Sequence, residues 1–132
     1  MNTIRDALPR KITVAGGVLI TLSGILNTIL GIQIRAIYYD PYPGGKMGHV
    51  GIIAGLIAVV IGLIILLGLP ILYNSPHNRW RVIAGFLTPV LGHLGAVFGA
   101  LYVGTLGVFF CYLAGIWLLV IYLQESKASK ER

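Results

Sequence analysis

The feature that most constrains the fold is the stretch from Val82 to Leu123, which contains no Asp, Glu, Lys or Arg. A single helix over this stretch would be roughly 60 Å long, which equals two crossings of a roughly 30 Å hydrocarbon core. A bilayer does not accommodate one straight helix of that length, so we expect the chain to fold back within it. We expect the turn in the segment "YVGTLG", Tyr102–Gly107.

Two further apolar runs are long enough to cross a membrane, from Ile12 to Ile34 and from Gly48 to Tyr73. The composition agrees, because 57% of the residues are hydrophobic and only 11% are charged, against about 45–50% and about 25% in soluble domains. The first run is too long for a signal-peptide core, so we expect it to be retained. The sequence therefore predicts an all-α integral membrane protein with a single membrane domain over residues 1–132 and spans near 12–34, 48–73, 82–102 and 105–124.

The basic residues predict the orientation of these spans. Four spans place both termini and the loop "NSPHNRWR" on one side of the membrane. That side carries Arg5, Arg10, Lys11, Arg79, Arg81, Lys127, Lys130 and Arg132. The other side carries only Arg35 and Lys46. Cytoplasmic loops are enriched in Lys and Arg, so we expect cytoplasmic termini in the cell membrane. The basic residues are scattered over short tails and one loop, which argues against a nucleic-acid partner.

Small residues recur at alternating spacings of three and four along each span, which keeps them on one helix face. Such faces let membrane helices approach closely and favour left-handed packing. We therefore predict a glycine-packed left-handed bundle of four transmembrane helices, and we expect the amide of Asn27 to assist helix pairing through a hydrogen bond. The expected packing residues are Gly17, Gly24, Asn27, Gly31, Gly55, Gly62, Gly85, Gly92 and Gly99.

His93 is the one ionisable side chain in the middle of the third span. A functional histidine there would ligate haem or a metal, carry protons, or contact a quinone. Each role needs partners, yet His49 and His77 belong to other depths and the expected spans contain no Asp or Glu. We therefore expect no cofactor and no metal site within the chain. The alternative is a neutral imidazole that hydrogen-bonds to Asn27 or to a backbone carbonyl across a glycine face.

Two connecting segments carry candidate contact residues. The outer loop contains Tyr38, Tyr39, Asp40 and Tyr42. It is either a docking loop for a partner, since tyrosines are enriched at interfaces, or an interfacial turn anchored in the headgroups. The inner loop ends in Arg79, Trp80 and Arg81, which we expect to anchor the chain at the inner surface and to contact anionic lipids.

Arg10 and Ala15–Gly17 at the first span, and the run from Arg79 to Gly85 at the third, give the chain a resemblance to a known group. The chain resembles small four-helix membrane proteins that are common in archaea. Similar subunits occur as accessory parts of respiratory oxidases and of archaeal ammonia-monooxygenase-type assemblies. The resemblance thus implies a place in a larger membrane enzyme complex.

The sequence carries no P-loop, HExxH, GxSxG or CxxC motif, so we expect no catalysis by the chain itself. We predict a non-catalytic accessory subunit of a membrane complex, with an oxidase or another energy-converting enzyme as the expected host and other transmembrane subunits as partners. Two alternatives stay open. One is a small homo-oligomeric channel or transporter with His93 near its pore, and the other is a haem- or quinone-binding subunit.

Overall fold

The computed structural model describes residues 3–37, 43–99 and 101–131, with the side chains of residues 5–35, 47–99 and 102–131. Every element of these ranges is helical. In chain order they are α1 (Thr3–Ile37), α2 (Pro43–Leu63), the π-helical turn η1 (Ile64–Gly68), α3 (Leu69–Tyr73), α4 (Asn78–Phe98) and α5 (Leu101–Glu131). Within the described ranges, four helices are long and apolar enough to cross a membrane. The expected all-α chain with four membrane-length helices is thereby confirmed.

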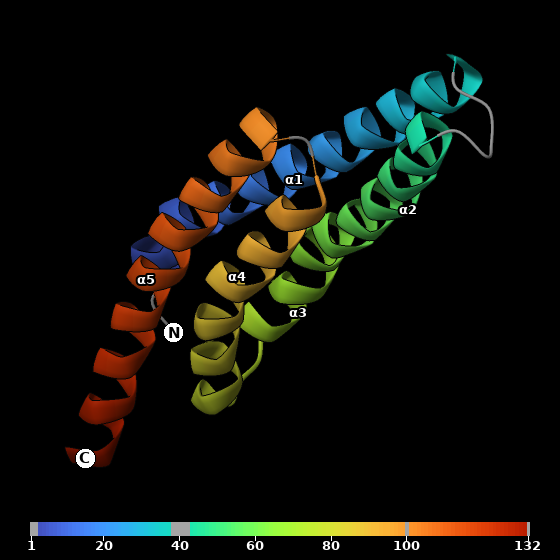
Figure 1. Cartoon of the computed structure of the whole chain (residues 1–132). Coiled ribbons are helices and arrows are strands. Elements are labelled where there is room, and N and C mark those ends of the chain that lie inside the picture. The colour runs from blue at the N-terminus through green and yellow to red at the C-terminus, as the bar shows by residue number, and fades with distance from the viewer. Residues whose placement is uncertain (1–2, 38–42, 100, 132) are drawn as a thin grey trace.

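The helices form two antiparallel pairs (Figure 1). α1 packs along α2, α4 packs along α5, and α1 also contacts α5. The start of α1, the α3–α4 connection and the end of α5 lie at one end of the bundle, which we call the terminal end. The α1–α2 pair extends well beyond the α4–α5 connection at the other, distal end. A hydrogen bond of 3.0 Å from Asn27 Nδ2 to the Phe98 carbonyl fixes that connection part-way along α1.

The turn between α4 and α5 differs from the expected position. α4 ends at Phe98, Gly99 is extended (φ −100°, ψ −176°) and α5 begins at Leu101, so the predicted turn at Tyr102–Gly107 is wrong and that segment is helical. The glycines of "YVGTLG" serve close packing instead. A Cβ on Gly104 would lie 3.3 Å from Ala96 Cα, and one on Gly107 would lie 2.8 Å from Ile20 Cγ1.

The second span contains an irregularity that the hydropathy pattern does not predict. Residues Ile64–Gly68 form a π-helical turn, and the Leu69 N–H bonds to the Ile64 carbonyl five residues back. Pro70 follows directly and has no N–H to continue the α-helical pattern. A π-bulge re-registers the backbone hydrogen bonds at such a point, so the span reaches Tyr73 as α2, η1 and α3.

α1 and α2 approach each other most closely at glycines. A Cβ on Gly24 would lie 2.6 Å from the Gly55 carbonyl oxygen, and a Cβ on Gly31 would lie 2.6 Å from the Gly48 carbonyl oxygen. Both neighbours are backbone atoms, which cannot rotate away as a flexible side chain can. The two helices therefore pack backbone to backbone, both near the level of the α4–α5 connection at Gly24 and in the part of the pair that extends beyond it at Gly31.

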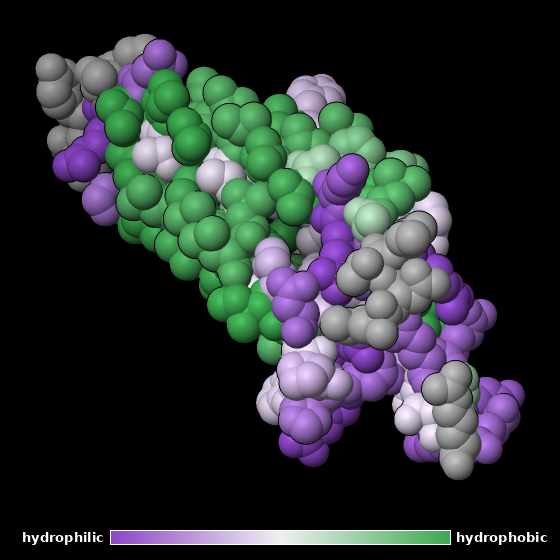
Figure 2. Space-filling model, turned by 180° about the vertical axis from the view of Figure 1, so that it is seen from behind, coloured by the Kyte–Doolittle hydropathy of each residue, from purple (hydrophilic) through white to green (hydrophobic). Residues whose placement is uncertain are grey.

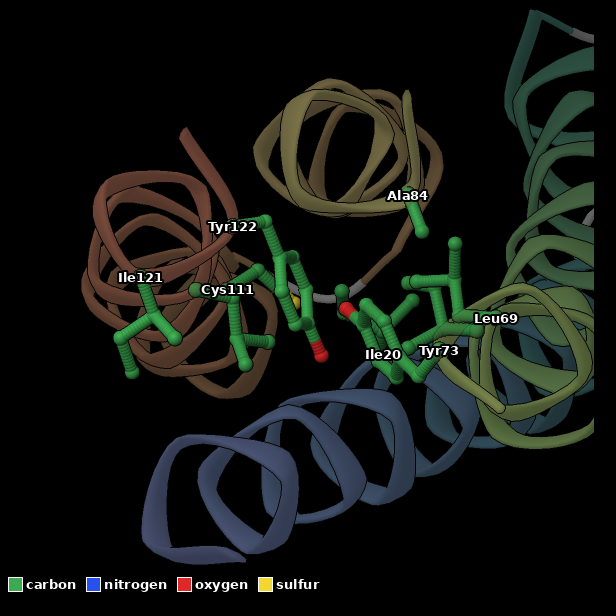
Figure 3. Packing of buried hydrophobic residues seen from close by; sticks show 9 residues of the cluster. Ile20, Leu69, Tyr73, Ala84, Cys111, Ile121 and Tyr122 are labelled. Atoms are coloured by element: carbon green, nitrogen blue, oxygen red, sulfur yellow. The ribbon is translucent and has the colours of Figure 1, made fainter. Parts of the chain in front are cut away.

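The core lies towards the terminal end, among α1, η1, α3, α4 and α5. Ile20, Ile65, Leu69, Ala84 and Leu118 are buried there with Cys111. The rings of Tyr73 and Tyr122 enter the space between the helices (Figure 3). Both rings are fully buried, so their hydroxyl groups must be satisfied inside the bundle.

The outer surface is strongly apolar. Large hydrophobic side chains are exposed along all the long helices, for example Leu30, Leu56, Phe86 and Ile116. Figure 2 shows that hydrophobic side chains cover the middle of the bundle, whereas hydrophilic side chains gather at the tip of the α1–α2 pair and around both termini. A soluble monomer rarely exposes an apolar surface of this extent.

Candidate functional site

A polar cluster closes the terminal end of the bundle. Asp6 of α1 is only 2% exposed. Its Oδ2 accepts a hydrogen bond of 2.9 Å from Arg10 Nε and one of 3.0 Å from the Tyr122 hydroxyl. The Arg10 guanidinium also forms an ion pair of 2.8 Å with the same oxygen. The buried carboxylate is thus paired with a cation and hydrogen-bonded, as a buried charge requires.

Arg10 connects this cluster to the end of the second span. It donates to the Tyr73 carbonyl at 2.7 Å and to Asn74 Oδ1 at 2.6 Å, and its guanidinium lies 5.6 Å above the Tyr73 ring. The Tyr73 hydroxyl hydrogen-bonds to Thr88 Oγ1, which itself donates to the Ala84 carbonyl at 2.8 Å. One continuous network therefore joins α1, α3, α4 and α5. The network thus connects these four helices at the terminal end through side-chain hydrogen bonds.

The three residues of the predicted inner anchor do not all face outwards. Arg79 and Trp80 are exposed, and the guanidinium lies 5.4 Å from the indole ring centre. Arg81 turns inwards instead: it is 8% exposed, lies 3.6 Å from Glu125 and sits 5.4 Å above the Tyr122 ring. Its Nε and Nη1 have no hydrogen-bond partner among the described residues. Only the first two residues of the anchor therefore face outwards.

His93 lies on the outer surface of the bundle, on α4. Its ring makes a T-shaped contact with the Tyr112 ring of α5, with ring centres 6.3 Å apart and planes at 86°. Tyr112 is itself 42% exposed. Within the described ranges neither side chain has a hydrogen-bond partner, and the amide of Asn27 donates to Phe98 rather than to the imidazole. The histidine thus belongs to a polar pair on an apolar surface, not to the bundle interior.

The predicted packing glycines all lie against another element. Gly24, Gly31 and Gly55 line the α1–α2 contact described above. At each remaining position a Cβ would come within 3.1 Å of an atom of a different element. These positions are Gly17, Gly62, Gly85, Gly92 and Gly99. The outer-loop residues Tyr38, Tyr39, Asp40 and Tyr42 lie outside the described residues.

The sequence analysis did not identify the Asp6–Arg10 ion pair, the contact of Tyr112 with His93 or the contact of Gly115 with Pro89. Asp6 and Arg10 stand four residues apart on one helix, a spacing that permits an ion pair, so that signal was present. Tyr112 gave no signal, because its importance comes from its position beside His93 on another helix. Gly115 accommodates the ring of Pro89, and a Cβ there would lie 3.0 Å from the Gly85 carbonyl oxygen.

The surface of the bundle has an apolar hollow in its second apolar segment. The hollow over η1 has a volume of about 350 Å³ and is lined by Val60, Leu63, Ile64, Leu67, Gly68 and Ile71.

No group of three or more His, Cys, Asp or Glu residues that could hold a metal occurs in the parts of the chain that the structure describes. Comparison with protein-family models, curated proteins and solved structures finds no match to this chain.

Proposed function

We propose that this chain is a non-catalytic accessory subunit of the cell membrane that packs against other transmembrane subunits of a larger complex. The observation that carries the proposal is the exposed pair of His93 and Tyr112 on an otherwise apolar face. His93 follows Arg81 by 12 residues and Tyr112 precedes Gln124 by 12, so each lies about 18 Å along its helix from those polar residues. That depth is close to the middle of a roughly 30 Å hydrocarbon core.

An imidazole and a phenol at this depth need hydrogen-bond partners. An unsatisfied polar group costs several kcal/mol in hydrocarbon, and within the described ranges the chain supplies none to this pair. Polar side chains inside membranes typically pair with neighbouring helices. A neighbouring subunit that covers the α4–α5 face and supplies hydrogen bonds would remove the cost.

The same proposal places the bundle in the membrane with its terminal end in the cytoplasm. The basic side chains Arg5, Lys11, Arg79 and Lys127 belong to that end, and the positive-inside rule favours this orientation. The close backbone approach at Gly24 and Gly55 supports a glycine-packed bundle, for which left-handed packing is our proposal.

Isolation of the native protein in mild detergent tests the proposal. We expect the chain to migrate in a complex that contains other transmembrane proteins besides this chain, and the resemblance described above makes oxidase-type enzymes the first candidates for these members. His93→Leu should reduce the yield of this complex, whereas the matched change His77→Leu, in the α3–α4 connection, should not. A lone monomer with no stable partner would overturn the proposal.

A homo-oligomeric channel or transporter is the competing function. It would also explain an outward-facing histidine, which could then line a pore between copies. Flux measurements in liposomes separate the two, because a channel should conduct and His93→Ala should change its conductance. If the chain is an accessory subunit, neither the wild type nor His93→Ala should give any flux.

We also propose that Arg79 and Trp80 contact anionic phospholipids at the cytoplasmic surface. Both side chains are exposed and stacked on each other at the start of α4, and juxtamembrane basic residues gain about 1 kcal/mol each near an anionic surface. The purified Arg79→Gln variant should retain less anionic phospholipid than the wild type. Lys130→Gln, a change near the end of α5, should leave lipid retention unchanged.

A further inference from the structure

We infer that the α4–α5 face is a contact between two copies of this chain, in which His93 of each copy hydrogen-bonds to Tyr112 of the other. The inference rests on the proposed membrane insertion. It identifies a second copy of this chain as the protein that covers the α4–α5 face. Other subunits of the complex would then contact the remaining faces of the dimer.

The symmetry of a membrane dimer leads to this pairing. Two copies with the same orientation are related by a two-fold axis parallel to the membrane normal, and a two-fold interface uses the same patch on both copies. Such an axis keeps each residue of the second copy at the same depth in the membrane as in the first. It also places the left side of the face of one copy opposite the right side of the face of the other. When the α4–α5 face packs on itself, α4 of one copy therefore lies against α5 of the other, and α5 against α4.

His93 and Tyr112 meet the depth requirement of this arrangement. Their rings are in contact, and the preceding residue Gly92 packs against Cys111, where a Cβ would lie 2.9 Å from the sulfur. The two residues are therefore level with each other on the antiparallel helices. The two-fold axis then brings His93 opposite Tyr112 of the second copy twice, with no sliding of one copy along the other.

The chemistry of the pair is self-complementary. A neutral imidazole has one N–H donor and one nitrogen acceptor, and a phenol hydroxyl both donates and accepts. Each side chain can thus satisfy the other across the axis without any charged group. The same exchange gives His93 and Tyr112 of each copy a hydrogen-bond partner, which no apolar helix from another protein would do.

The residues one helical turn away are suitable for the surrounding contact. Val90 and Val97 flank His93 on α4, and Phe109 and Ile116 flank Tyr112 on α5. All four side chains are exposed. Because the axis pairs α4 with α5, the smaller valines of one copy would lie against the larger side chains of the other.

Crosslinking in native membranes tests the geometry. Two differently tagged copies are co-expressed in a Cys111→Ala background, one with His93→Cys and the other with Tyr112→Cys. A short thiol-to-thiol linker should join the two tags efficiently. It should join two His93→Cys copies poorly, since α4 lies diagonally from α4 in this dimer. Ile71→Cys, an exposed position on α3, is the control and should not crosslink to itself.

Dimer dissociation constants in detergent test the hydrogen bonds. One interhelical hydrogen bond changes an association constant by about threefold, and each single variant removes two by symmetry. His93→Leu and Tyr112→Phe should therefore each weaken the dimer by about tenfold. The double variant should be no weaker than either single one, because it leaves no orphaned group. Tyr102→Phe, the same change at the start of α5, should have no effect.

Each result has a distinct meaning. The inference is supported if the linker joins the two tags through positions 93 and 112. It also requires that the effects of His93→Leu and Tyr112→Phe on the dimer do not add in the double variant. A complex that holds one copy of this chain with a different protein on the α4–α5 face overturns the inference and leaves the proposed function standing. A dimer that crosslinks through Ile71→Cys, or variants whose effects add to about a hundredfold, also overturns it. A lone monomer overturns both the inference and the proposed function.

Discussion

Adding one methyl group at Gly24 should destabilise the bundle, whereas adding it at Gly68 should not. At Gly24 a Cβ would lie 2.6 Å from both the Gly55 carbonyl oxygen and the Val59 backbone nitrogen. Neither atom can yield without moving α1 away from α2. At Gly68 the nearest atom to a Cβ is Ile64 Cγ2 at 3.6 Å, an ordinary contact.

The comparison of Gly24→Ala with Gly68→Ala isolates the steric term. Both changes replace glycine by alanine inside a helical segment, and the accompanying gain in helix propensity, up to about 1 kcal/mol, is similar for both. Forcing an extra methyl group into a packed contact costs about 1–3 kcal/mol. Gly24→Ala should therefore be less stable than Gly68→Ala by that amount, which corresponds to roughly a 5- to 150-fold change in the folded-to-unfolded ratio.

Reversible unfolding in mixed micelles with increasing sodium dodecyl sulfate, followed by circular dichroism and by energy transfer between labels on α1 and α2, measures the difference. Gly24→Ala should unfold at a lower denaturant fraction than the wild type, and Gly68→Ala at the same or a higher one. Equal stability of the two alanine variants would refute the reasoning, because the α1–α2 contact would then have room for a methyl group.

Three further predictions concern other parts of the bundle. Tyr122→Phe removes a buried hydrogen bond to a carboxylate and should lower stability by about 1–3 kcal/mol in the same unfolding assay; an unchanged midpoint would contradict the network. Gly115→Ala should destabilise the bundle because the Pro89 ring occupies the place of its Cβ, by about 1–3 kcal/mol, and should be better tolerated when combined with Pro89→Ala. In intact cells a membrane-impermeant thiol reagent should label His49→Cys, but should label Lys127→Cys only after permeabilisation; the reverse pattern would place the terminal end outside.

Hydropathy alone was sufficient to predict four membrane-length helices. The apolar runs are long and nearly free of charge, and their length leaves few alternatives at about 1.5 Å per residue. The position of the α4–α5 turn was not predictable in the same way. Gly99 and the glycines of Tyr102–Gly107 look alike in sequence, and only the backbone conformation in the folded structure shows which of them leaves the helix. Gly104 and Gly107 contact α4 and α1, whereas Gly99 is extended.

The polar cluster at the terminal end shows a similar limit. Asp6 and Arg10 are close in sequence, so their ion pair follows from helical spacing. Tyr122 is 116 residues away from Asp6 along the chain, yet donates a hydrogen bond to it. Such a contact depends on the way α5 returns beside α1, which local pattern does not specify. Arg81 is a second example: the sequence predicts it at the lipid surface, but it lies in the interior beside Glu125 of α5.

The sequence by itself determined the class of fold, because the length and charge of apolar segments depend only on the order of residues. The tertiary structure decided which faces of those helices are used. Periodicity shows that small residues share a face with one another, but it does not show which helix that face meets or what remains outside. His93 illustrates the difference: its position near the middle of an apolar run follows from counting residues, whereas its exposure beside Tyr112 arises from how α4 is rotated against α5.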